Sequence, residues 1–114
     1  MATIAAAMSG VITDLQTAAT TGNGTVLAIP NSFRNHNFLV KGSAGVASGV
    51  VTIETSNDPA DAGTWAAVTT AVTVLASTDL ITQFVGLLNF VRARVSTVIS
   101  GGTVTVQYTG AKSY

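Results

Sequence analysis

The sequence contains no cysteine, which excludes disulfide scaffolds, thiolate metal sites and cysteine nucleophiles. It also contains few charges, because five basic and five acidic residues among 114 give a formal net charge of zero. A chain without excess positive charge has no electrostatic footprint for phosphate groups. Nucleic acid is therefore not expected as a partner.

Long hydrophobic runs are missing as well, although the mean hydropathy is high at +0.51. The longest charge-free run, residues 15–33, is interrupted by Gln16, Pro30 and several glycines and asparagines. A helix that spans a membrane needs about 20 mostly apolar residues. The first 13 residues carry no Lys or Arg, so they lack the positive region of a secretory signal. No membrane partner is expected.

Small apolar and hydroxyl side chains take the place of charges. The chain has 18 Thr, 17 Ala and 15 Val, while only 9% of its residues are charged. An ordinary soluble domain carries about 25% charged residues. A neutral surface of this kind loses water at low cost, and zero net charge removes the repulsion that keeps small proteins apart. The composition therefore favours a component of an assembly.

Strand signals dominate from residue 24 onward, because β-branched residues recur with period two between Gly, Asn, Asp and Pro. The patterns predict strands over 24–29, 36–41, 49–55, 64–68, 71–76, 82–99 and 103–108, with 82–99 split near Gly86 and Asn89. Strands this short, with turns every 8 to 12 residues, indicate an all-β fold, an antiparallel two-sheet sandwich or jelly roll.

The alternation also predicts which side chains face the core. His36, Phe38 and Val40 share one face of their strand. The same holds for three further sets, namely Val51 and Ile53; Val91, Ala93 and Val95; and Val104, Val106 and Tyr108. Thr52, Glu54, Arg92 and Arg94 fall on the opposite, water-facing side.

The first 20 residues are ambiguous, since alanine favours helix whereas Val11, Ile12 and Thr13 favour strand. A short helix, a β-arm and an irregular segment all remain open. We expect residues 1–20 to form an N-terminal arm and residues 21–114 to form the β-sandwich domain. The arm offers Thr3, Ile4 and Met8 as candidate partner-interface residues.

Groups that support catalysis or metal binding are scarce. His36 is the single histidine, and no G-x-S-x-G motif occurs. His36 could pair with an aspartate in a hydrolase, but we favour its interpretation as a partly buried, hydrogen-bonded residue of a strand. Asp58 and Asp61, with Asn57 and Glu54 nearby, form the best metal candidate, but turn formation accounts for the same residues. We therefore expect no enzyme activity, no catalytic or metal residues and no cofactor.

Partner contacts have better candidates. Trp65, the only tryptophan, follows a loop, where it would either cap the sandwich core or stack on a sugar ring or partner. Arg92 and Arg94 project from one face of a strand, where they would either bind a partner's carboxylates or pair with Glu54 or Asp79.

Two segments together carry a family resemblance, VVTIETSNDPADAGTWAAV at 50–68 and FVRARVSTVISGGTVTVQYTG at 90–110. They resemble the small β-sandwich virion proteins of tailed bacteriophages, in which a strand like V-T-I-E-T-S-N-D leads to a strand carrying a Trp, and a hairpin like V-R-A-R-V and S-G-G-T-V-T-V closes the module. The resemblance covers about half of the chain, and within that group the chain looks most like a capsid decoration (cement) protein.

The resemblance implies a structural protein on the capsid exterior of a virion, assembled in the host cytoplasm. Such proteins bind the major capsid protein and copies of themselves, often as homotrimers, and stabilise the lattice; many anchor through an N-terminal arm. The alternative is a tail or fibre module that binds a host-surface glycan or acts as an adaptor.

Overall fold

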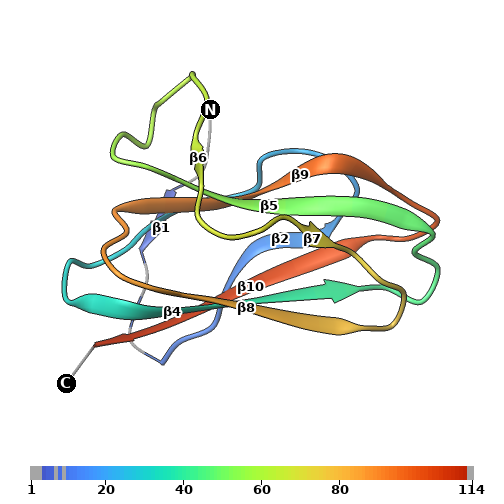
Figure 1. The fold of residues 1–114 in the computed structure, drawn as a ribbon, viewed down its shortest axis with the longest axis horizontal. Helices are drawn as coiled ribbons and strands as arrows, with labels where there is room; N and C mark the ends of the chain where they lie inside the picture. The colour runs from blue at the N-terminus through green and yellow to red at the C-terminus, as the bar shows by residue number, and fades with distance from the viewer. Residues whose placement is uncertain (1–3, 7, 9, 113–114) are drawn as a thin grey trace.

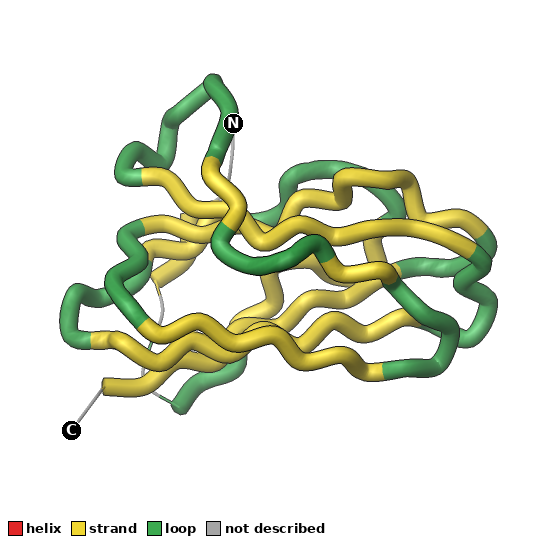
Figure 2. The backbone as a smooth tube through the Cα atoms, in the orientation of Figure 1, coloured by secondary structure: helices red, strands yellow, loops and turns green. Residues whose placement is uncertain are grey.

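The computed structural model of the chain describes the backbone of residues 4–6, and it describes residues 8 and 10–112 in full (Figure 1). Within these residues the protein is all-β, with two sheets packed face to face and no helix (Figure 2). The strands are β1 (Ile4–Ala6), β2 (Thr13–Ala19), β3 (Val26–Ala28), β4 (Phe33–Gly42), β5 (Ser48–Ser56), β6 (Ala66–Ala67), β7 (Val72–Thr73), β8 (Asp79–Val85), β9 (Phe90–Ser100) and β10 (Val104–Lys112). The predicted β-sandwich is confirmed.

One sheet has six strands in the order β1-β3-β9-β5-β6, with β7 also pairing β5, and the other has four in the order β2-β10-β4-β8. Pairing is antiparallel throughout, except that β1 lies parallel to β3. The predicted division of 82–99 is also confirmed, because β8 ends at Val85 and β9 begins at Phe90. Two long ladders, β5–β9 and β10–β4–β8, therefore form the body of the sandwich.

The core lies between the sheets and consists of the side chains that the alternation placed inward. Phe38, Val51, Ile53, Val106 and Tyr108 are completely or almost completely buried. They come from the central strands of both sheets, where successive side chains alternate between the core and the outer face. The residues between these inward positions point away from the core and form the outer faces of the two sheets.

The N-terminal segment contains two strands and no helix among its described residues, while residues 8 and 10–12 lie outside both strands. β1 joins the edge of the six-stranded sheet and β2 joins the edge of the four-stranded sheet, so residues 13–19 belong to the sandwich. Gln16 is buried, and its Nε2 donates to the carbonyls of Gly22 at 3.0 Å and Ala93 at 2.7 Å. Thr3 lies outside the described residues, whereas Met8 is exposed.

Candidate functional site

The outer face of the six-stranded sheet carries a buried acid between two arginines. Glu54 on β5 lies directly opposite Arg92 on β9, and Arg94 is two residues further along β9. Arg92 Nε donates to Glu54 Oε1 and Arg94 Nε donates to Glu54 Oε2, both at 3.0 Å. Glu54 is only 3% exposed, and the side chains of Arg92 and Arg94 are 13% and 40% exposed. Of the two alternatives, the arginines thus adopt the internal pairing with Glu54.

Trp65 covers one of these two arginines. Its ring lies over Arg92, whose Cζ is 4.3 Å from the ring centroid, and its Nε1 donates to the carbonyl of Asp61 at 3.0 Å. Trp65 is 3% exposed, so its ring has little surface left for a sugar or a partner. A guanidinium over an aromatic face is attractive, and more so when water is excluded. We refer to Glu54, Trp65, Arg92 and Arg94 as the Glu54 cluster.

The acidic loop before Trp65 is held by turns of its own. Asp58 Oδ1 accepts from the backbone N–H of Ala60 at 2.9 Å, and Asp61 Oδ1 accepts from that of Gly63 at 2.8 Å. Asn57 Oδ1 accepts from the Asn89 amide at 2.7 Å, while Glu54 is engaged by the arginines. The described part of the chain holds no group of three or more His, Cys, Asp or Glu side chains arranged for a metal ion. Turn formation therefore accounts for these residues.

His36 lies on the inner side of β4, in a buried hydrogen-bond chain. Its Nε2 is 2.8 Å from the Gly86 carbonyl and its Nδ1 is 2.7 Å from the Tyr108 hydroxyl. Because a carbonyl only accepts, Nε2 carries the proton and Nδ1 accepts from Tyr108. Both ring nitrogens are thus occupied, as the structural interpretation of His36 predicts, and neither is free to take a proton from a substrate.

Burial sets the protonation of both groups. Desolvation lowers the pKa of His36 below its ordinary value of 6.5, the bond to Gly86 opposes this shift, and the positive charge of Arg34 adds to it. Desolvation also raises the pKa of the completely buried Tyr108 hydroxyl well above its ordinary range. The pair is therefore neutral near pH 7, and it acts as a structural element beneath the four-stranded sheet.

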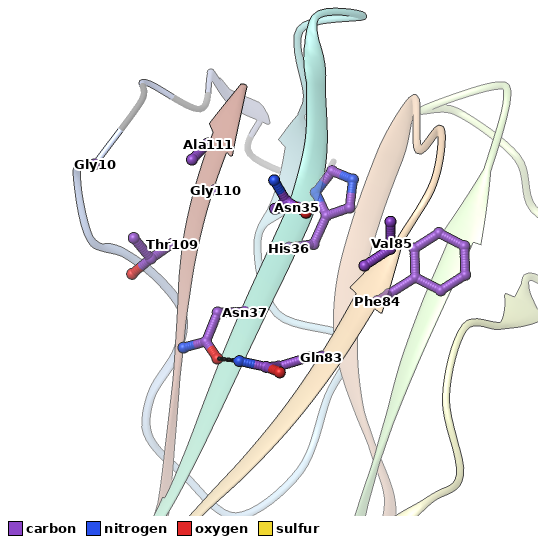
Figure 3. A pocket seen from close by; sticks show the side chains of 10 residues that line it. All are labelled: Gly10, Asn35, His36, Asn37, Gln83, Phe84, Val85, Thr109, Gly110 and Ala111. Atoms are coloured by element: carbon purple, nitrogen blue, oxygen red, sulfur yellow. Dashed lines mark hydrogen bonds between the residues drawn. The ribbon is translucent and has the colours of Figure 1, made fainter. Parts of the chain in front are cut away.

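The outer face of that sheet contains a hollow of about 400 Å³ that the sequence patterns did not indicate (Figure 3). Its walls come from three neighbouring strands, β4, β8 and β10, and from Gly10. No charged side chain is among the described residues that line it, and Gln83 Nε2 donates to Asn37 Oδ1 at 3.2 Å across two strands. The lining residues are Gly10, Asn35, His36, Asn37, Gln83, Phe84, Val85, Thr109, Gly110 and Ala111.

An exposed aliphatic side chain forms part of the wall of this hollow. Val85 is 75% exposed on its wall, and Ile81, 65% exposed, lies on the same face of β8 four residues earlier. Met8, an expected interface residue, is exposed two positions before Gly10. The signal for this surface was present in the sequence, because Asn35, Asn37 and Leu39 alternate with inward residues, but period-two polarity alone does not reveal a concave face.

The structure thus separates the expected interface residues. Trp65, Arg92 and Arg94 come together in the Glu54 cluster, on the outer face of one sheet, whereas Met8 is exposed two residues before Gly10, which lines the hollow of the other sheet. Ile4 lies in β1. The two outer faces therefore differ in how many of their polar side chains remain available to a partner.

Comparison with known proteins found no matching family model, no matching curated protein and no matching solved structure. Among the described residues, no helix is long and apolar enough to cross a membrane.

Proposed function

We propose that this chain is a structural protein of a phage virion that adheres to the outer surface of the capsid and stabilises its lattice. Its partners would be the major capsid protein and further copies of the chain. The observation that carries the proposal is the hollow on the outer face of the four-stranded sheet, which no charged side chain of the described residues lines and whose wall includes the exposed Val85. Such a face supplies contact area without the cost of stripping water from charges.

The same surface argues for adhesion rather than chemistry. Apart from His36, the polar side chains that line the hollow are three amides and a hydroxyl, which donate and accept hydrogen bonds but do not titrate near pH 7. His36 lies beneath this face with both ring nitrogens bonded. The resemblance of residues 50–68 and 90–110 to phage virion modules points to a capsid as the surface that is bound.

Capsids of the source phage that lack this protein provide the test, by cosedimentation and by cryo-electron microscopy of the decorated particles. We expect wild type to bind in many copies on the exterior. Thr109→Lys places an ammonium in the hollow, on a central strand, and should weaken binding at least about tenfold, which corresponds to about 1.4 kcal/mol.

Val98→Lys is the matched control, since it adds the same charge at an exposed position of β9, in the other sheet. It should bind as wild type does. Absence of wild-type binding to the capsids would refute the capsid role, and equal binding by Thr109→Lys would exclude the hollow as the contact surface.

A second candidate is recognition of a host-surface glycan by a tail-associated module. The three amide side chains of the hollow, Asn35, Asn37 and Gln83, favour it, because amides both donate to and accept from sugar hydroxyls. A glycan array probed with wild type and Asn37→Ala tests this candidate. Signals that require Asn37 would support it, and an array without signals would remove it.

A further inference from the structure

β8 is an edge strand whose outward backbone groups find no partner in the part of the chain that the structure describes. Its ladder with β4 is bounded by two hydrogen bonds, from Gly42 N–H to the Thr78 carbonyl and from Gly86 N–H to the Arg34 carbonyl. Hydrogen-bonded pairs alternate along antiparallel strands, so the even-numbered residues of β8 direct their N–H and C=O groups toward β4. Within the described residues no hydrogen bond reaches the outward groups. Those groups belong to the odd-numbered residues Asp79, Ile81, Gln83 and Val85.

The other edges of the sandwich differ from β8. β1 has three residues, and β6 and β7 have two each, so they offer little backbone for pairing. β2 is interrupted by two register shifts against β10 and contains Ala18 at a positive φ of 44°. Bulges and short lengths of this kind are the usual ways in which edge strands avoid pairing.

β8 has none of these protections. It runs for seven residues in unbroken register with β4 (Figure 1). Its sequence, DLITQFV, contains no Pro, Gly, Lys or Arg, and its one charge, Asp79, lies at the first position. A long, regular and nearly uncharged edge is a template for another strand.

The side chains of β8 also indicate a missing neighbour. Every residue of the strand is exposed or half-buried, whereas the adjacent β4 has four buried residues in its pattern. Leu80 and Phe84 pack against the core but remain partly open to water. A further strand alongside β8 would cover both of them and extend the apolar contact, in addition to satisfying the backbone groups.

We propose that β8 pairs antiparallel with β8 of a second copy of this chain, forming one continuous sheet of eight strands across a two-fold axis. An isologous contact requires a self-complementary surface, and this strand provides one. With the axis at Gln83, the two Gln83 residues face each other, and Ile81 of each copy lies opposite Val85 of the other. These aliphatic side chains are 65% and 75% exposed in the single chain.

Charge favours the same occupant. The antiparallel arrangement puts the two Asp79 residues at opposite ends of the shared ladder, so the only charge of the strand does not oppose itself. The chain has a formal net charge of zero, so two copies approach without overall repulsion. A strand from a different protein would have to supply this uncharged pattern from elsewhere, whereas a second copy carries it already.

Sedimentation equilibrium of the purified chain tests the pairing without capsids, so its failure is distinguishable from failure of the proposed function. Wild type should shift with concentration from 11.5 kDa toward twice that mass. Ile81→Lys puts an ammonium at the contact and should weaken self-association at least about tenfold. Val98→Lys, exposed on β9, should associate as wild type does.

Amide hydrogen exchange supplies a readout that does not depend on a variant folding. The amides of Ile81, Gln83 and Val85 should become more protected as concentration rises, while those of Leu80 and Phe84 should be protected at every concentration.

A wild-type chain that stays monomeric at hundreds of micromolar would overturn the proposal. So would a trimer, or any oligomer that Ile81→Lys leaves intact. A monomer whose capsid binding is lost in Ile81→Lys would assign this edge to a strand of another protein, and would also overturn self-pairing.

Discussion

The outer faces of the two sheets differ in whether their polar groups bond to one another or remain open to a partner. On the six-stranded sheet, the buried Glu54 pairs with two arginines of the same chain, and Trp65 lies over one of them, Arg92. On the four-stranded sheet, the outward amides line an open hollow, and the edge strand β8 keeps free backbone groups. Both faces arise from the same period-two alternation of strands.

The difference shows that outward position does not by itself make a residue available to a partner. The loop that follows β5 brings Trp65 onto Arg92, one of the two arginines that bind Glu54. On the six-stranded sheet, the charged groups of Glu54, Arg92 and Arg94 therefore pair with one another instead of with a partner. On the other side, neutral side chains remain free for contact.

The largest expected effect is loss of the acid from the Glu54 cluster. Glu54→Ala leaves Arg92 without its carboxylate in a buried setting, and breaking such a pair by removing one partner costs about 3–5 kcal/mol. Urea denaturation followed by Trp65 fluorescence measures the change in the free energy of unfolding.

Arg94→Ala serves as the matched comparison, because its side chain is 40% exposed and Glu54 keeps its bond to Arg92. It should cost no more than about 1 kcal/mol. Equal losses for Glu54→Ala and Arg94→Ala would show that the cluster is not closed to water.

The next effect concerns the hydrogen-bond chain beneath the four-stranded sheet. Tyr108→Phe removes the hydroxyl that donates to His36 Nδ1 and leaves that buried nitrogen unsatisfied. The cost should be about 1–3 kcal/mol. Thermal and urea unfolding of the variant measure it, and an unchanged midpoint would mean that water replaces the hydroxyl.

Protonation of His36 should produce a smaller, pH-dependent loss. Because burial lowers the pKa of His36 in the folded state, the unfolded chain binds the proton more readily. Stability from this group is complete above pH 6.5 and is lost as the pH falls toward the folded pKa, at up to about 1.4 kcal/mol per pH unit. Unfolding between pH 7.5 and 5.5 should show this slope in wild type and not in His36→Gln.

The smallest effect is expected on the open face. Thr109→Lys and Val98→Lys both change outward side chains, so each should alter the free energy of unfolding by no more than about 0.5 kcal/mol. Urea denaturation of the two variants checks this. A large loss in Thr109→Lys would indicate that the hollow is part of the folding core rather than a contact surface.

Most of the strand architecture could be predicted from alternation and turn residues. Phe38, Ile53 and Tyr108 are inward as expected, and the break at Gly86 and Asn89 separates β8 from β9. Glu54 is the instructive difference, because alternation puts it outward, yet it is buried. Alternation describes one strand at a time, whereas Glu54 is engaged by Arg92 and Arg94 from the neighbouring strand β9.

The candidate site was less predictable. The sequence identified Trp65, Arg92 and Arg94 as interface candidates and left open whether the arginines pair internally, which they do. The hollow escaped notice because its wall residues are ordinary polar and aliphatic side chains, spread from position 10 to position 111. Only the pairing of β4 with β8 and β10 brings them together.

The amino-acid sequence alone determined the neutral, charge-poor surface, the absence of thiol chemistry and the strand periodicity that commits the chain to a β-sandwich. These properties are local or additive, and they do not depend on which strands become neighbours. The tertiary structure decided which polar groups are satisfied internally, as in the Glu54 cluster, and which edge remains open at β8. Those outcomes depend on contacts between residues distant in sequence, and such contacts exist only after the two sheets have formed and packed.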